Sequence, residues 1–220
     1  MDTTALWLTL KLATLTTLIL LIVGLPLAWW LATTRWRGRV IVEAIVSLPL
    51  VLPPTVIGFY FLMATGPRTR IGATYEEWFG GTLPFSFAGI LMASVIFNMP
   101  FVLRPFIVGF SGIDRAFLEA SWGLGASRIR TFFRVAMPLA WSGVLSGIVL
   151  GFAHTVGEFG VVLMVGGNIP GVTRTLSISL YDDVQAMNYE SAAQTALWLV
   201  GFAFLSLSLV MSISRRYRPM

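Results

Sequence analysis

Apolar residues along this 220-residue chain gather into five long runs that polar segments separate. Each run reaches the roughly 20 residues that a helix needs to cross the apolar core of a bilayer. The pattern therefore predicts an all-α integral membrane protein with about five transmembrane helices, over residues 5–33, 40–64, 85–110, 137–164 and 192–213.

Two polar segments do not fit a simple connection between spanning helices. Residues 66–84 form a polar loop with aromatic anchors, and residues 159–191 are too polar to span and contain the turn-rich stretch GGNIPG. Irregular backbone at membrane depth is tolerated only where protein buries it or where it lines a cavity. Residues 159–191 therefore indicate a transport pathway.

Prolines interrupt the second and third runs, at positions 49, 53, 54, 100 and 105. Each removes a backbone donor, so both helices are expected to kink. Membrane helices also tolerate single prolines by packing against neighbours. For the adjacent prolines at 53 and 54, a bend that shapes a pore is as well supported as simple packing. Thr55, the next residue, is then a candidate pathway residue.

Composition supports the membrane assignment and excludes some chemistry. Only 11% of the residues are charged, against about a quarter in soluble domains, and the mean hydropathy is +0.82. With no cysteine and a single histidine, neither a disulfide framework nor a usual metal site is expected. No internal repeat or second domain is evident, so residues 1–220 are expected to form one transmembrane domain that binds no cofactor itself.

Arginines predict the orientation in the membrane. The net charge of +5 is better explained by cytoplasmic loops than by nucleic-acid binding, which would need a basic stripe. Ten arginines follow the first, third and fifth runs, against Arg68, Arg70 and Arg174 on the other side. The positive-inside rule then places the N-terminus outside and the C-terminus in the cytoplasm. The ten are Arg35, Arg37, Arg39, Arg115, Arg128, Arg130, Arg134, Arg215, Arg216 and Arg218.

Five ionisable residues fall at membrane depth. Lys11, Glu43 and Arg104 lie near predicted interfaces, where long side chains reach water. His154 and Glu158 are four residues apart and are expected on one helical face at the outer end of the fourth run. They form either a structural pair or part of an external gate, and we favour a gate-forming structural role without proton chemistry.

Enzyme chemistry has little support in the sequence. The only lysine stands in LTLKLATL, so the chain lacks a phosphate-binding P-loop. The only histidine lies about two helical turns from Ser146, too far for a nucleophile–base pair on one helix. We therefore expect a non-catalytic protein.

The polar segment between the third and fourth runs, about residues 111–137, predicts two short helices. Asp114 suits the N-cap of a helix that runs through Trp122, after which two glycines stop it. Ser127 suits the next N-cap, and Pro138 suits the first turn of the fourth spanning helix. An apolar stripe is expected along the second helix, at Ile129, Phe132, Phe133 and Ala136. An amphipathic helix on the membrane surface would explain the stripe but not the glycine turn.

This segment resembles the cytoplasmic signature of the membrane subunits of binding-protein-dependent ABC importers. That signature is Glu-Ala-Ala, three residues, Gly, nine residues and Ile-x-Leu-Pro, and the spacing here matches throughout. Ser121, Val135 and Met137 are conservative departures from it. The resemblance implies that ATPase coupling falls to Glu119, Ala120, Ser121, Gly125, Val135, Met137 and Pro138.

What the resemblance implies is a type I ABC importer permease in the bacterial inner membrane. A second copy of the chain, two ATPase subunits carrying ATP and Mg, and an extracytoplasmic oxyanion-binding protein would complete the assembly. Closure of the ATPases would drive alternating access between the two sides. A self-contained channel or secondary transporter is the rival class, and the inverted repeats and midplane ligands typical of the latter are not evident.

The segments LPLVLPPTVIGFY, GEFG (157–160) and GNIPGVTRTL narrow the resemblance to molybdate importer permeases. Sulfate/thiosulfate permeases are close relatives, and tungstate is nearly identical to molybdate in charge and shape. We expect no tight anion site, and a passage lined by Thr55, Gly157, Glu158, Phe159 and Gly160. Arg68, Arg70 and Arg174 are either binding-protein contacts or ordinary loop charges.

Overall fold

The computed structural model describes residues 2–216, with side chains through residue 213, and its secondary structure is entirely helical within that range. The α-helices are α1 (Thr3–Thr33), α2 (Arg39–Ser47), α3 (Pro54–Thr65), α4 (Arg70–Phe79), α5 (Phe87–Ser111), α6 (Arg115–Gly123), α7 (Arg128–Thr131), α8 (Met137–Leu139), α9 (Trp141–Gly157), α10 (Gly160–Gly166), α11 (Leu176–Gln185) and α12 (Tyr189–Arg216). A 3₁₀ turn, η1 (Leu48–Leu50), follows α2, and a π-helical turn, η2 (Phe132–Ala136), joins α7 to α8.

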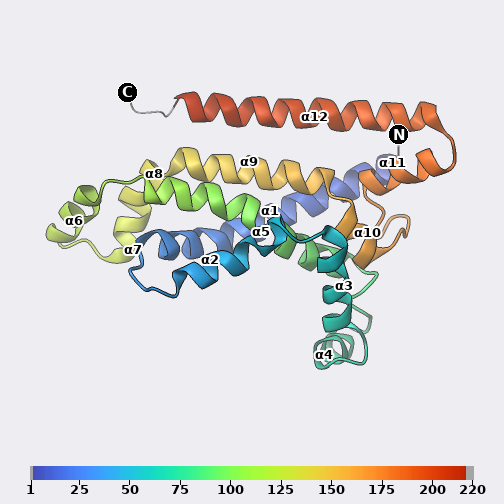
Figure 1. The fold of residues 1–220 in the computed structure, drawn as a ribbon, viewed down its shortest axis with the longest axis horizontal. Coiled ribbons are helices and arrows are strands. Elements are labelled where there is room, and N and C mark those ends of the chain that lie inside the picture. The colour runs from blue at the N-terminus through green and yellow to red at the C-terminus, as the bar shows by residue number, and fades with distance from the viewer. Residues whose placement is uncertain (1, 217–220) are drawn as a thin grey trace.

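Four helices, α1, α5, α9 and α12, run along the long axis of the molecule (Figure 1). Helices α6 and α7 project at one end, and α10 and α11 lie toward the other. Helix α3 crosses the bundle direction and carries α4 at its far end. The segments that precede and follow the long helices therefore gather at two opposite ends, as crossings of a bilayer require.

Three helices are long and apolar enough to span a membrane: α1, α5 and residues 189–213 of α12. Two bent pairs qualify as broken spans, with bends of 109° between residues 39–50 and 54–65 and of 76° between residues 128–139 and 141–157. Counting each bent pair as one span gives up to five, in agreement with the prediction of about five.

The prolines act differently in the two runs. The second run is broken between α2 and α3, because Pro53 and Pro54 occupy the cap and first turn of a new helix. The third run is one continuous helix, since α5 continues through Pro100 and Pro105, and the kink expected there stays a prediction. The fourth run is broken twice, at Ala140 and at Glu158–Phe159, so Pro138 belongs to the short α8 and not to the first turn of α9.

Small residues let α5 and α9 approach closely. Gly143, Gly147 and Gly151 recur every fourth residue and so share one face of α9. A Cβ on Gly147 would lie 2.5 Å from Phe106 Cε1, and one on Gly143 would lie 2.6 Å from the Pro105 carbonyl oxygen. Small residues at this spacing promote helix packing in membranes, where apolar side chains gain little from leaving lipid.

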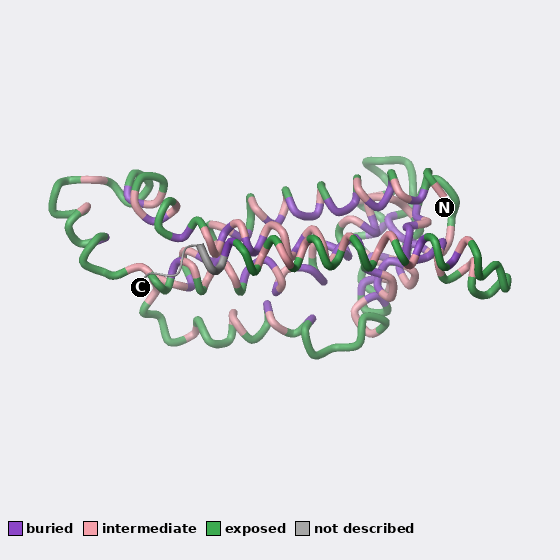
Figure 2. Tube along the Cα trace, turned by 90° about the horizontal axis from the view of Figure 1, so that it is seen from above, coloured by how far each residue is buried: buried purple, intermediate pink, exposed green. Residues whose placement is uncertain are grey.

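Two apolar clusters form the core. One contains Leu12, Ile90 and Val162 and lies toward the α10 end; the other contains Phe106 and Val144 and lies toward the α7 end. Helix α12 contributes little, because only 6% of its most apolar window is buried within the chain. Figure 2 shows the burial concentrated where the long helices meet, with the projecting α6–α7 end mostly exposed.

Candidate functional site

The segment between α5 and α9 forms the predicted helix–turn–helix. The Asp114 carboxylate caps α6 by accepting a hydrogen bond from the Ala116 N–H at 2.9 Å. The chain then reverses at Gly125, whose φ of +79° favours glycine. Ser127 Oγ accepts from the Arg130 N–H at 3.3 Å and caps α7. Both predicted caps are confirmed.

A hydroxyl pair fixes the two short helices to each other. Ser121 Oγ on α6 lies 2.9 Å from Thr131 Oγ1 on α7, and Thr131 is completely buried. Leu118 and Ala136 insert into the apolar cluster that contains Phe106, which anchors the segment to α5. Ser121 departs from the alanine of the family signature, and here the extra hydroxyl makes a specific contact.

Glu119 is exposed on α6 and lies in a cleft that several arginines share. The cleft is lined by Arg35 from the loop between α1 and α2, by Arg39 at the start of α2, and by Arg115 of α6 itself. Among residues with described side chains, the only ion pair is between Arg174 and Asp182, so none of these side chains holds Glu119 in a salt bridge. Its carboxylate is thus available to a partner, and its proposed coupling role stays a prediction.

The apolar stripe predicted along the second short helix is only half right. Ile129 of α7 and Phe133 of the π-helical turn Phe132–Ala136 are 72% and 64% exposed. Ala136 is buried and Phe132 is partly buried. Leu124, at the turn, is 89% exposed. Leu124, Ile129 and Phe133 therefore leave uncovered apolar surface on the part of the chain that projects from the bundle.

The remaining signature residues lie along the same connection. Ala120 and Pro138 are exposed, whereas Val135 and Met137 are half-buried and pack against the apolar cluster of Phe106. The signature thus combines residues that face outward with residues that attach the segment to the bundle.

The candidate pathway residues lie at two breaks that meet in space. Helix α9 ends at Gly157, Glu158 and Phe159 are not helical, and α10 begins at Gly160. A Cβ on Gly160 would lie 2.8 Å from Pro54 Cβ, at the start of α3, and Thr55 is the next residue. The structure thus brings the Thr55 region against Gly157–Gly160, although these residues are far apart in sequence.

A buried polar network adjoins this junction. The Asn98 amide of α5 donates from Nδ2 to Glu158 Oε2 at 2.7 Å, and its Oδ1 lies 2.7 Å from His154 Nδ1. The His154 ring stacks on Phe101 with centroids 3.6 Å apart. His154 and Glu158 do not share a helical face, as the sequence had suggested, because α9 ends between them. Asn98 joins them instead.

Asn98 is the residue that the sequence analysis missed. It is fully buried, and it stands in the apolar stretch SVIFNMPF, where an amide must find hydrogen-bond partners. That isolation within an apolar run was the available signal. Glu158 is also buried, and its Oε1 has no hydrogen-bond partner among the described residues.

The three arginines proposed to contact a binding protein differ in their surroundings. Arg68 and Arg70 are exposed, the latter in the first turn of α4. Arg174 is partly buried, pairs with Asp182 at 3.2 Å and donates from Nε to Asn168 Oδ1 at 2.6 Å. Asn168 in turn donates to Asp182 at 2.6 Å, so Arg174 is already engaged in holding the loop before α11.

Residues that could hold a metal ion do not come together within the described part of the chain. No group of three or more His, Cys, Asp or Glu residues has the arrangement of a metal site there. The features that remain are a projecting segment, two meeting helix breaks and a buried amide network.

Comparison with protein families gives a match over residues 24–218 to the binding-protein-dependent transport system inner membrane component. The chain is 51% identical to the molybdenum transport system permease protein ModB of Azotobacter vinelandii, over 99% of this chain and 96% of the relative. It is 36% identical to ModB of Escherichia coli K12 (94% and 90% covered) and 30% identical to a probable sulfate transport system permease of Chlorella vulgaris (92% and 76%).

Solved structures share the fold. The MetNI methionine ABC transporter in an inward-facing conformation matches with a TM-score of 0.76 and 19% identity, over 98% of this chain and 95% of that one. A bacterial alginate ABC transporter in complex with its periplasmic protein matches with a TM-score of 0.74 and 17% identity, over 98% and 77%.

Proposed function

Because this chain belongs to the family of binding-protein-dependent transport system inner membrane components, we propose that it imports a tetrahedral oxyanion and that this oxyanion is molybdate. It is a multi-pass inner-membrane permease subunit with the type I ABC importer permease fold, and not an enzyme. The observation that supports molybdate as the substrate is the 51% identity, over 99% of the chain, with a molybdenum permease.

Sulfate or thiosulfate is the alternative substrate. Its support is weaker, because the sulfate permease of Chlorella vulgaris is 30% identical to this chain. Tungstate has the charge and shape of molybdate, so the two anions are expected to share the pathway. A self-contained channel or secondary transporter is the alternative class, and family membership counts against it.

The orientation in this proposal follows from charge. The arginines at 35, 37 and 39 precede or begin α2, and those at 115, 128, 130 and 134 lie in α6, α7 and η2, at the same end of the molecule (Figure 1). The positive-inside rule makes that end cytoplasmic and the N-terminus external. Three of the ten arginines that the sequence places on the cytoplasmic side are C-terminal. Arg218 lies outside the described residues, and no side chain is described for Arg215 or Arg216.

Energy must come from a partner, since the sequence has no P-loop. In the proposal, two ATPase subunits that bind ATP and Mg dock on α6 and α7, within the coupling segment of about residues 111–137. The exposed carboxylate of Glu119 and the uncovered side chains of Leu124, Ile129 and Phe133 support this, because apolar groups exposed among arginines suit a protein contact. The hydroxyl pair Ser121–Thr131 would make the segment move as one body.

Transport in this proposal is alternating access between two copies of the chain. The breaks at Pro53–Pro54 and Glu158–Phe159 allow α3 and α10 to move relative to α2 and α9, and both breaks meet at Thr55 and Gly157–Gly160. An oxyanion-binding protein would deliver the anion at the external end, where Arg68 and Arg70 are exposed. Arg174 is a weaker candidate for that contact because Asp182 already pairs with it.

Deleting this chain from its own cells tests the substrate assignment. At limiting molybdate, cellular molybdenum measured by mass spectrometry is expected to fall and to recover when the chain is restored, while sulfate uptake is unchanged. Unchanged cellular molybdenum combined with reduced sulfate uptake would show that the substrate is sulfate and not molybdate.

A further inference from the structure

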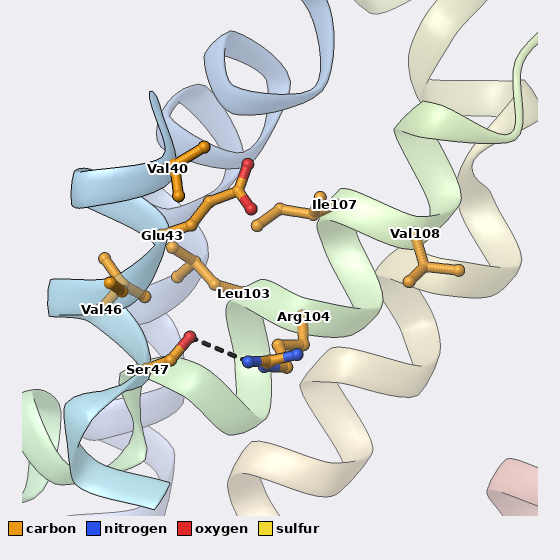
Figure 3. Close-up of a pocket in the computed structure, with 9 residues that line it drawn as sticks. Val40, Glu43, Val46, Ser47, Leu103, Arg104, Ile107 and Val108 are labelled. Carbon is orange, nitrogen blue, oxygen red and sulfur yellow. Dashed lines mark hydrogen bonds between the residues drawn. The ribbon is translucent and has the colours of Figure 1, made fainter. Parts of the chain in front are cut away.

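An arginine of α5, Arg104, is exposed in a groove between α2 and α5 (Figure 3). The groove has a volume of about 360 Å³, and its polar side chains are Glu43 and Ser47 of α2 and Arg104 of α5. Arg104 precedes the end of α5 at Ser111 by seven residues, roughly 10 Å along the helix. It therefore lies in the half of the bundle nearer α6 and α7.

The arginine has a neutral partner within the chain. Arg104 Nη2 donates a hydrogen bond to Ser47 Oγ at 3.1 Å, and the guanidinium points toward Ser47 in Figure 3. Glu43 lines the same groove one turn earlier on α2, but the two do not form an ion pair. A guanidinium stays charged, and at membrane depth an unpaired charge is costly unless water or a counter-ion reaches it.

We propose that Arg104 and Ser47 form a weak binding site for the transported tetrahedral oxyanion, occupied between passage of the helix breaks and release at the α6–α7 end. A guanidinium presents paired N–H donors that match two oxygens of such an anion. Ser47 accepts from Arg104 and still has its own hydroxyl proton to donate. This inference rests on the proposed function, because it takes the transported cargo to be an oxyanion.

The position of the groove is consistent with a binding site on the transport pathway. Helix α2 leads through η1 to the break at Pro53, so the groove lies on the helix that directly precedes the junction of Thr55 and Gly160 in the chain. In α2 only Val46 is buried, which leaves the helix available to line a passage between two copies. The Glu43 carboxylate repels a dianion, and that repulsion keeps the site weak enough to release its ligand.

A single-cysteine variant provides the test, because the natural chain has no cysteine. In full-length Ser47→Cys permease in inverted membrane vesicles, we measure modification by anionic and cationic methanethiosulfonate reagents. Arg104 is expected to raise the rate of modification by the anionic reagent about fivefold, equivalent to about 1 kcal/mol. Millimolar molybdate is expected to slow the reaction. Leu124→Cys, at the exposed turn between α6 and α7 on the side that the reagents reach, is the control and should show no molybdate protection.

Second variants make the test specific. Adding Arg104→Gln should remove both the charge preference and the protection, and Arg104→Lys should retain the preference with weaker protection. Glu43→Gln should make molybdate protect at several-fold lower concentration, which mere damage to the fold would not produce. Unchanged protection in Arg104→Gln would overturn the site and leave the proposed function standing, provided that the wild-type assembly imports molybdate.

Two other occupants of the groove give distinct results. Modification that is slowed by phosphatidylglycerol in the vesicles, but not by molybdate in phosphatidylcholine, would identify a lipid headgroup site and overturn the proposal. Failure of both reagents to react would indicate that a second copy covers the groove, with Glu43 of one copy paired to Arg104 of the other, and would also overturn it. Failure of the proposed function is read separately, as the absence of oxyanion import by the wild-type assembly.

Discussion

The Asn98 amide joins two polar side chains that come from either side of the helix break at Glu158. Inside a membrane protein, each buried polar group that loses its partner costs about 1–3 kcal/mol. Asn98 therefore stabilises the contact between α5 and the end of α9. It also fixes the conformation of the break that we place on the transport pathway.

Asn98→Leu is expected to destabilise the permease, because Glu158 and His154 would both lose a buried hydrogen bond. A loss of about 2 kcal/mol corresponds to a fall of roughly 5 °C in the thermal unfolding midpoint for a chain of this size. Tryptophan fluorescence of the purified permease measures it. Asn188→Leu, at an exposed residue, is the matched control. Equal midpoints for the two variants would show that the network contributes little.

Glu119→Lys is expected to leave the permease folded and inserted but to impair ATPase docking, because the residue is exposed and its charge would join the neighbouring arginines. We expect at least a tenfold loss of substrate-stimulated ATP hydrolysis in the assembled transporter, equivalent to about 1.4 kcal/mol. Glu76→Lys, on the exposed face of α4, is the control. Full stimulation in Glu119→Lys would exclude the coupling role.

At the residue scale, local chemistry was predictable and long-range pairing was not. The caps Asp114 and Ser127 followed from residue type and the next few positions. The Asn98 network joins residues about 60 positions apart, so no local pattern contains it. The same holds for the pair of Ser121 and Thr131, which depends on the turn between α6 and α7.

Among the helices, the contact between α5 and α9 depends on the absence of side chains. The face of Gly143, Gly147 and Gly151 lies against Pro105, Phe106 and Val102 of α5. This contact holds the third and fourth spans together at the base of the projecting segment. Motion of α6 and α7 is therefore expected to act on a tightly packed helix pair.

Gly147→Ala is expected to destabilise the permease by about 1–3 kcal/mol, because the added methyl group would overlap Phe106. The matched control is Gly201→Ala in α12, where a Cβ meets nothing within 4 Å. Thermal unfolding midpoints of the two variants make the comparison. Equal stability would mean that α5 and α9 separate easily, contrary to the structure.

The sequence predicted where the long helices lie more accurately than it predicted where those helices break. The apolar runs located the long helices, because length and hydropathy decide what spans a bilayer. The fate of each proline depended on its neighbours: Pro53 and Pro54 start a helix, whereas Pro100 and Pro105 are accommodated inside α5. The π-helical turn Phe132–Ala136 has no signal in the apolar periodicity.

For the whole molecule, the chain is incomplete by itself. Helices α2 and α12 leave most of their apolar residues exposed, and the projecting segment carries uncovered apolar side chains. Lipid, a second copy and an ATPase are the partners that the proposed function supplies for these surfaces. The family was recognisable in the sequence through the signature in residues 119–138, because its spacing lies within one short segment.

Orientation is testable by labelling from one side. Single cysteines at Leu124, on the projecting turn, and at Ala186, after α11, are both exposed and lie toward opposite ends. An impermeant thiol reagent applied to intact spheroplasts is expected to modify the cysteine at 186 and not the one at 124. In inverted vesicles the pattern should reverse. The same accessibility from one side for both positions would refute the topology.

The most direct test of the central claim is molybdate uptake by proteoliposomes that contain this chain with its ATPase and its binding protein. We predict uptake only when all three proteins and ATP are present, and none with this chain alone, because the chain lacks a P-loop. Molybdate flux through the chain alone, without ATP, would contradict the account and make it a self-contained channel or secondary transporter.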